Sequence, residues 1–286
     1  MSYLCIYHAN CADGFAAAWV VHRALGDQVE FHAATYGDTP PEVINKHVLV
    51  VDFSYPLEDL TRMQSRANSV MVLDHHKTAE ADLRDIEAGS ASFHNHDHVG
   101  LRAIFNQTTS GAGLVWDWFN PGDPRPLIID YVEDRDLWKF QKDHSREINS
   151  FISTIEDDFG VWDTEAESLE DDLGFEMARG IGHTLEKWKR EYVDDAVSAS
   201  KRIMRIGGHD VPCANVPFRM ASDAGNLMCK GNPFAATYCD TEKGRVFSLR
   251  STDAGLDVSV VAKSYGGGGH RNASGFKMPI GWEGDL

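Results

Sequence analysis

Four short stretches of the chain carry side chains that bind metal ions or exchange protons. In the clearest of them, SVMVLDHHKTA (residues 69–79), an apolar run ends on an acid followed by two histidines. The candidate residues are His8 and Asp13 in CIYHANCAD, Asp52 in VLVVD, Asp74, His75 and His76 in VMVLDHH, and Asp134 and Asp136 in YVEDRD. Carboxylates and imidazoles suit a borderline-hard cation, foremost Mn²⁺, with Mg²⁺, Fe²⁺, Co²⁺ and Zn²⁺ as alternatives. The four stretches together predict a metal site.

The number of acids in these stretches favours two metal ions. Several carboxylates in one pocket repel each other and resist ionisation unless cations neutralise them. A pair of ions meets that need and is suited to activating water for attack on a phosphate ester. Each residue alone is a weaker signal, because a lone aspartate at a strand end, such as Asp52, is more often a helix cap or a turn former.

Short apolar strands and helices alternate in the first half of the chain. We expect strands at residues 3–8, 29–36, 47–53 and 69–76, with helices between them. Such alternation predicts an α/β domain built on a mostly parallel sheet that is covered on both faces. In these sheets functional side chains gather where the strands end, at their carboxyl edge. Three of the four candidate stretches lie at such strand ends.

Further helices are expected over residues 110–119, 125–138 and about 165–205, and a second unit follows. Its predicted strands are 210–217, 234–240 and 245–251, and its predicted helices are 220–230 and 256–266. We therefore expect a parallel-sheet domain over 1–190, a helical linker over 191–202, and a smaller C-terminal α/β domain over 203–286.

The second unit ends on a glycine run, GGGGHRNASGF. Consecutive glycines allow positive φ and close approach of the backbone, so that N–H groups can converge on a phosphate. The run follows a predicted helix and is therefore not a dinucleotide-binding fingerprint, and a flexible helix exit would look the same. The candidate substrate-binding residues in and near it are Gly267, Gly268, Gly269, His270, Arg271, Asn272 and, in FSLRS, Arg250.

In this order the motifs resemble those of the DHH phosphoesterases, in the branch that carries a C-terminal DHHA1 domain. That branch includes RecJ-like exonucleases, nanoRNases that finish short oligonucleotides, and cyclic-dinucleotide phosphodiesterases. The four motifs appear as HANCADGFAAA, VVDFS, LDHHKTA and VEDRDLW, while FSLRS and GGGGHRNASGF resemble the DHHA1 signature. The resemblance covers nearly the whole chain.

The resemblance also implies roles. The implied metal ligands are His8, Asp13, Asp52, His75 and, from the fourth motif, Asp134, for which Asp136 is the second choice. Asp52 would bridge two ions, with Mn²⁺ the expected metal. Asp74 would orient the neighbouring imidazole, and His76 would lie near the scissile phosphate, so Asp52, Asp74 and His76 are the implied catalytic residues. The glycine run and Arg250 would grip the nucleotide.

One position departs from the family pattern. The first motif of the family commonly has two aspartates spaced D-x-D before the glycine, and here the earlier position is Cys11. A thiolate could serve as a ligand, whereas a neutral thiol would leave one ion short of a charge. A packed Cys11, with Asn10 or water at the ligand position, is the alternative. This departure bears on the identity and affinity of the metal bound by His8.

Composition limits the partners and the compartment. The five cysteines include no CxxC pair, and the sequence has no apolar leader or membrane-spanning run, so we expect a cytoplasmic protein in a reducing environment. Of the net charge of −17, residues before Ile203 carry −18. Such a chain should not coat long nucleic acid, because that binding depends on many Lys and Arg contacts to phosphates.

We therefore predict a metal-dependent phosphodiesterase acting on short oligonucleotides or small nucleotides. A cyclic dinucleotide, 3′-phosphoadenosine phosphate and long single-stranded DNA remain as substrates to test. The alternative from another class is a nucleic-acid or nucleotide-binding module with a degraded catalytic site, motivated by Cys11. A pyrophosphatase-like enzyme is disfavoured by the GGGGH ending. Oligomeric state is left open, a homodimer included.

Overall fold

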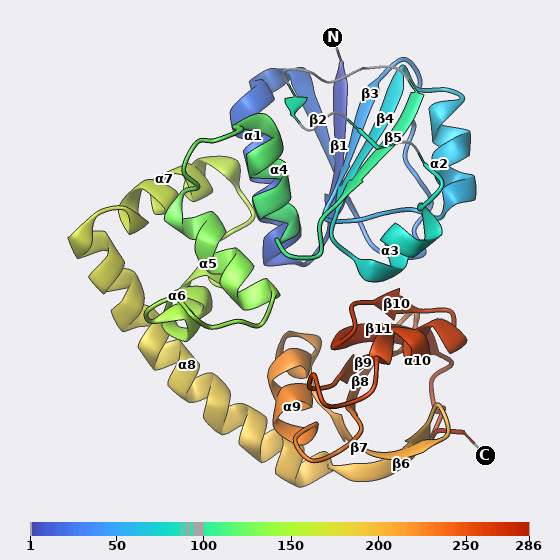
Figure 1. The fold of residues 1–286 in the computed structure, drawn as a ribbon. Coiled ribbons are helices and arrows are strands. Elements are labelled where there is room, and N and C mark those ends of the chain that lie inside the picture. Colours follow the sequence, from blue (N-terminus) through green and yellow to red (C-terminus); the bar gives the residue numbers. More distant parts are fainter. Residues whose placement is uncertain (1, 87, 90–91, 94–99, 286) are drawn as a thin grey trace. The chain divides into compact units, whose positions relative to one another are not determined.

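The computed structural model describes residues 2–86, 88–89, 92–93 and 100–285 of the 286-residue chain. These residues form two compact units, Met1–Glu186 and Lys187–Leu286. Each unit contains one β-sheet with helices packed on it (Figure 1). The predicted α/β class with two sheets is confirmed, while the predicted domain limits at 190 and 203 stay a prediction. No helix among the described residues is long and apolar enough to cross a membrane.

The first unit is built on a five-stranded sheet in the order β2-β1-β3-β4-β5, and every neighbouring pair is parallel. Its strands are β1 (Tyr3–His8), β2 (Val29–Ala34), β3 (His47–Val51), β4 (Ser69–Asp74) and β5 (Gly100–Phe105). Four of them were predicted, and β5 was not. The expected parallel sheet is therefore confirmed.

Helices cover both faces of this sheet, as Figure 1 shows. On one face the core combines alternate strand residues, such as Leu49 and Val51 of β3, with α1 (Ala12–Leu25), α4 (Gly111–Phe119) and α5 (Leu127–Asp136). On the other face the intervening residues pack against α2 (Leu57–Gln64). Successive strand residues point to opposite faces, so a strand buried on both faces is apolar throughout.

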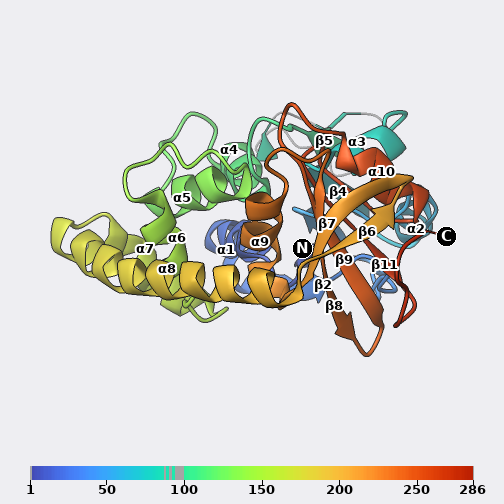
Figure 2. The ribbon, with the colours of Figure 1, turned by 90° about the horizontal axis from the view of Figure 1, so that it is seen from below.

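The remaining helical elements of this unit are η1 (Gly26–Gln28), α3 (Lys77–Asp82), α6 (Ser145–Ile152), α7 (Phe159–Leu169) and the first part of α8 (Asp172–Ser200). The prediction of a single helix over about 165–205 is wrong, because α7 and α8 are two separate helices. The Asp171 carboxylate accepts the N–H groups of Leu173 and Gly174, at 3.0 and 3.1 Å, and this cap starts α8 as a separate helix. Figure 2 shows α8 lengthwise.

The second unit is built on a six-stranded mixed sheet in the order β10-β11-β9-β8-β7-β6, in which only β7 and β8 are parallel. Its strands are β6 (Arg202–Ile206), β7 (His209–Asn215), β8 (Ala235–Thr241), β9 (Gly244–Arg250), β10 (Gly268–Gly269) and β11 (Ala273–Met278). Three of these strands were predicted. Residues 202–205, expected in the long helix, instead form most of the edge strand β6.

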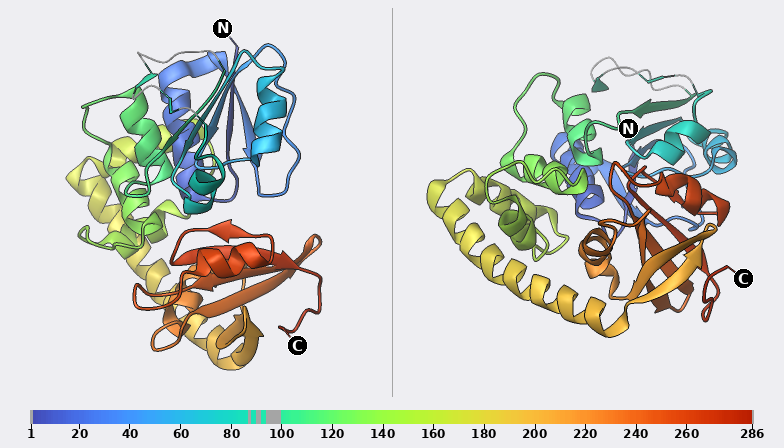
Figure 3. Two further views of the ribbon diagram at one scale, coloured as in Figure 1. Left: turned by 45° about the vertical axis from the view of Figure 1, so that its right-hand side comes forward. Right: turned by 60° about the horizontal axis from the view of Figure 1, so that its bottom comes forward.

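Helices lie against this second sheet, which Figure 3 shows from two further directions. They are η3 (Phe218–Met220), α9 (Ala221–Met228) and α10 (Val258–Ser264). Phe247 and Phe276 stack at 4.9 Å in the core beside Val258 of α10. Val193 and Val197, from the end of α8, pack with residues of α9 in a second cluster.

Candidate active site

The candidate residues of three motifs lie side by side at the carboxyl edge of the first sheet. Val51 of β3 pairs with Tyr7 of β1 and with Leu73 of β4. The next residues along these three adjacent strands are therefore His8, Asp52 and Asp74. This is the edge at which parallel sheets form their functional crevices.

Asp52 lies at the centre of the cluster. Its Oδ1 is 3.1 Å from His75 Nε2, and its Oδ2 is 3.7 Å from His8 Nδ1. Asp52 is buried and has a φ of +51°, in the left-handed region that non-glycine residues rarely adopt. Such strained backbone is concentrated at functional sites, where the surrounding structure holds it in place.

Asp13 joins the cluster from the first turn of α1. Its carboxylate accepts the N–H groups of Gly111 and Ala112, at 2.6 and 2.9 Å, and so binds the N-terminus of α4. His75 Nε2 lies 3.6 Å from Asp13 Oδ2. The first and third motifs therefore meet in space.

Two glycines allow this close approach. A Cβ on Gly14 would lie 2.2 Å from the backbone oxygen of His8, and one on Gly111 would lie 2.4 Å from Asp52 Cβ. Gly111 was missed in the sequence. The signal for it was SGAG, in which Ser110 caps α4 by accepting the N–H of Gly113 and small residues open an otherwise apolar helix.

The fourth motif contributes Asp136 to this cluster. Asp136 Oδ2 lies 3.6 Å from His75 Nε2. Asp134, the preferred choice from the sequence, is buried elsewhere, and its carboxylate accepts the N–H groups of Gln141 and Lys142 at 2.9 and 3.2 Å. Asp134 thus holds the loop after α5, and the structure places Asp136 with the other candidate ligands in its stead.

The side chains of the cluster shift one another's pKa values. Burial and the nearby Asp52 and Asp136 carboxylates raise the pKa of Asp13 well above its usual value. Burial alone would raise the pKa of Asp52 too, but the imidazoles of His75 and His8 hold it well below its usual range. Burial opposes protonation of His75, yet the carboxylates of Asp136 and Asp52 raise its pKa to about 11. Protons on Asp13 and His75 thus offset the negative charge that bound cations would otherwise neutralise.

The donor atoms fit metal ions. In each of two groups that share no residue, the ligand atoms lie within 4.8 Å of one another. One group is His8, Cys11 and Asp52, and the other is Asp13, His75 and Asp136. Among the described residues, His8 Nδ1 and Asp52 Oδ1 are buried atoms without a hydrogen bond. Buried polar atoms left in this state are costly unless something else binds them. Imidazole, carboxylate and one sulfur suit the borderline cations expected from the sequence.

Cys11 occupies the N-cap position of α1, and its side chain makes no cap hydrogen bond. Burial, followed by the negative charge of Asp52, raises the pKa of its thiol well above the usual value. Without a cation the group is therefore a neutral thiol. Its sulfur still lies within reach of His8 and Asp52.

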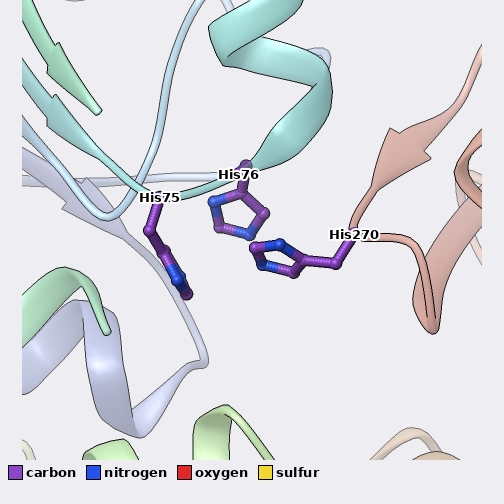
Figure 4. A group of neighbouring side chains, drawn as sticks. All are labelled: His75, His76 and His270. Carbon is purple, nitrogen blue, oxygen red and sulfur yellow. The ribbon is translucent and has the colours of Figure 1, made fainter. Parts of the chain in front are cut away.

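Asp74 and His76 form a second contact pair beside His75. Asp74 Oδ1 is 2.7 Å from His76 Nδ1 and also accepts the N–H of His75 at 2.8 Å. Burial opposes the charged form of His76, but Asp74 raises its pKa above the usual value. Figure 4 shows both imidazoles leaving the chain between β4 and α3, and their ring centres are 4.7 Å apart. The imidazole that Asp74 orients is that of His76.

In the second unit, the residues predicted to bind substrate make contacts within the unit. Arg250 donates to Ser222 Oγ at 2.7 Å. Arg271 donates to the backbone oxygens of Asp253 and Gly255, and Asn272 donates to the Asp253 carboxylate at 2.6 Å. The bonds of Arg271 and Asn272 fix the loop after β9 against the turn between β10 and β11, and the bond of Arg250 joins β9 to α9.

The glycine run forms the start of that hairpin. A Cβ on Gly267 would lie 2.0 Å from the backbone oxygen of Gly275, and one on Gly269 would lie 2.6 Å from that of Ala273. Gly268 pairs with Gly275 in the ladder between β10 and β11. His270 follows in the turn, where its N–H donates to the backbone oxygen of Ala273 at 2.8 Å. Close packing against β11 thus accounts for these glycines, and phosphate binding stays a prediction.

Comparison with known proteins agrees with this architecture. No protein-family model matches the chain. It is 28% identical to the uncharacterized protein R106 of Acanthamoeba polyphaga mimivirus, over 94% of this chain and 66% of that protein. It is 24% identical to oligoribonuclease NrnB of Bacillus subtilis (strain 168), over 94% of this chain and 71% of that protein. The chain thus spans about two thirds of the length of these curated relatives.

Among solved structures, the chain is similar to the DHH domain of a protein described as a member of a family of ribosomal proteins. The TM-score is 0.51 with 14% sequence identity, and the alignment covers 97% of this chain and 83% of that one. This similarity concerns the fold, and the fold expected from the four motifs is thereby confirmed.

Proposed function

We propose that this chain, which has the fold of the DHH-domain proteins, is a metal-dependent phosphodiesterase acting on short oligonucleotides or small nucleotides. The observation that carries the proposal is the meeting of candidate ligands from β1, α1, β3, β4 and α5 at one edge of a parallel sheet. Two of the groups of side chains that could hold an ion share no residue, and this supports a pair of metal ions.

The proposed ligands are His8, Asp52 and the Cys11 sulfur for one ion and Asp13, His75 and Asp136 for the other. Asp52 lies between the groups, because its two oxygens approach His75 and His8 separately. When bound, the metal ions supply a nucleophile from water and neutralise charge on the phosphoryl oxygens. Mn²⁺ is the proposed metal.

The chain's own residues supply orientation and charge. Asp74 Oδ1 lies 2.7 Å from Nδ1 of His76, which fixes the orientation of the imidazole ring. Because Asp74 favours the protonated form, His76 can donate a charge-assisted hydrogen bond to a phosphoryl oxygen. The N–H groups of Gly111 and Ala112 keep the Asp13 carboxylate aimed at the cluster.

Short substrates are favoured over long nucleic acid for two reasons. The residues before Ile203 carry a net charge of −18, which offers no long-range attraction to a polyanion. One relative is an oligoribonuclease by its printed name. Binding of the nucleotide by Arg250 and the 267–272 segment is part of this proposal.

A hydrolysis panel tests the proposal. The protein is stripped with EDTA, reloaded with Mn²⁺, Mg²⁺, Co²⁺ or Zn²⁺, and assayed on dinucleotides, longer RNA and DNA, cyclic dinucleotides and phosphoadenosine phosphate. We expect Mn²⁺-dependent release of nucleotide, fastest with the shortest linear substrates. Hydrolysis that survives metal removal would contradict the metal role, and preference for kilobase DNA would contradict the size argument.

Cys11 favours one alternative, a nucleotide-binding module without hydrolysis. If the neutral thiol leaves one group of ligands unable to hold its ion, nucleotides should bind without turnover. The same panel distinguishes the two, since the module would bind short oligonucleotides and hydrolyse none of them with any metal.

A further inference from the structure

Tyr36 is a half-exposed aromatic residue at the rim of the candidate metal cluster. Its side chain lies in the loop that follows β2, and the residue is 50% exposed. Phe53, whose ring contacts that of Tyr36, is buried, as is Tyr55, whose ring contacts that of Phe53. Phe53 belongs to the buried core, and Tyr36 lies at the edge of that core. The centres of the two rings are 4.9 Å apart.

The loop holds Tyr36 in a defined turn. The Asp38 carboxylate accepts the N–H of Thr35 at 2.8 Å and the Thr35 hydroxyl at 2.7 Å, and Asp38 donates its N–H to the Thr35 backbone oxygen. Gly37 has a φ of +93°, as a type II turn requires at its third position. Tyr36 is the second residue of this turn, so its backbone is held in place before any ligand arrives.

The ring lies beside two residues that the proposed function assigns to the reaction. Its centre is 5.5 Å from that of His8 and 6.1 Å from that of His76, and both imidazoles meet it nearly edge on, at 73° and 78°. His8 is a proposed metal ligand and His76 a proposed phosphate ligand. A group attached to a phosphate bound there would lie within reach of the exposed part of Tyr36.

We propose that Tyr36 is a stacking platform for a nucleobase of the substrate, an inference that rests on the proposed function and deepens it. Every base has a π-face, and stacking on a preformed aromatic ring needs no particular base sequence. The ring would therefore select phosphate esters that carry a base over inorganic phosphates, with little choice among bases. Holding its backbone in the Thr35–Asp38 turn lowers the entropy lost on binding.

The test compares Tyr36→Leu with Tyr36→Phe on two substrates. One is a ribodinucleotide, and the other is the same phosphodiester with one nucleobase removed. Tyr36→Leu should lower kcat/KM for the dinucleotide about tenfold, whereas Tyr36→Phe should recover most of it, because stacking depends on the ring. On the abasic substrate the two variants should differ by less than about twofold. Ile44→Ala, another exposed apolar residue of this unit, is the control.

A binding measurement separates failure of this inference from failure of the proposed function. 2-Aminopurine ribonucleoside monophosphate loses fluorescence when its base stacks, and no hydrolysis is needed. We expect quenching by the wild type and by Tyr36→Phe, and its loss in Tyr36→Leu with unchanged Mn²⁺ affinity. Equal quenching in all three proteins, or an equal loss of kcat/KM on both substrates, would overturn the platform. Quenching without turnover of any substrate would overturn only the phosphodiesterase.

Discussion

Replacing Gly111 with alanine tests whether the cluster depends on the close approach of α4 to the end of β3. The new Cβ would lie 2.4 Å from Asp52 Cβ and 2.6 Å from Asp52 Oδ1. Non-bonded carbon atoms are in favourable contact at about 3.5–4.0 Å, so Asp52 or α4 must move by about 1 Å. Asp13 is bound to the same N-terminus through the N–H of Gly111, so a shift of α4 would move it too.

The expected magnitude follows from this displacement. A misplacement of about 1 Å in a catalytic group costs about a hundredfold in rate, and overpacking costs about 1–3 kcal/mol in the free energy of unfolding. We therefore expect Gly111→Ala to fold, to bind Mn²⁺ more weakly, and to lose about a hundredfold in kcat/KM on a dinucleotide. The assays are steady-state kinetics, Mn²⁺ titration by calorimetry and urea unfolding.

Gly180→Ala is the matched control. Gly180 lies in α8 with no atom within 4 Å of an added Cβ, so the same substitution should leave kinetics unchanged. It should raise the free energy of unfolding by up to about 1 kcal/mol, because alanine favours the helix. Wild-type kinetics and Mn²⁺ affinity in Gly111→Ala would refute the idea that this contact sets the geometry of Asp52.

The remaining predictions concern single residues. Asp52→Asn should reduce turnover by about a hundredfold or more, because the proposed bridging charge is lost. Circular dichroism should show that the protein stays folded, and normal turnover with metal bound would exclude the bridge. Asp136→Asn should lose activity without loss of stability, whereas Asp134→Asn should lower the free energy of unfolding by about 1–3 kcal/mol through its two backbone partners; the opposite pattern would restore Asp134 as the ligand. Cys11→Asp should tighten Mn²⁺ binding in calorimetry, because a carboxylate suits Mn²⁺ better than a sulfur at the same position, and unchanged binding would exclude position 11 as a ligand. His270→Ala should raise KM for dinucleotides, and a fall in kcat alone would mean that it acts only in the transition state.

Much of the first unit could be predicted from sequence because its strands are short apolar runs buried on both faces. After their first residue, β3 and β4 are apolar up to the residue that ends the run, Asp52 or Asp74. This run of apolar residues predicts both the strands and the position of the two aspartates at their ends. β5 was missed because GLRAIF has an arginine within six residues and most of its positions are only partly buried. β6 was missed because it is an edge strand, whose pairing with β7 is a tertiary contact.

The site was predictable where it depends on strand ends and unpredictable where it depends on contacts between distant elements. His8, Asp52 and His75 follow from the register of a parallel sheet, which brings successive strand ends together. Gly111 gives no such signal, because its partner Asp52 is far away in the chain and only the fold would bring an added Cβ to 2.4 Å from it. A glycine in an apolar helix start has many explanations until its neighbour is known.

Helix geometry separates Asp134 from Asp136 as candidate ligands. The two lie on α5, and at about 100° per residue they point in nearly opposite directions. Only one of them can therefore face the strand ends. Asp136 follows the buried Ile129 and Val132 at spacings of seven and four, so it lies on the same side of α5, where it is exposed and its Oδ2 lies 3.6 Å from His75 Nε2. Asp134 instead binds the N–H groups of the following loop, and that loop in turn ends α5 directly after Asp136. The fourth motif thus has two acids in two different positions: Asp134 closes the helix, and Asp136 lies with the candidate metal ligands.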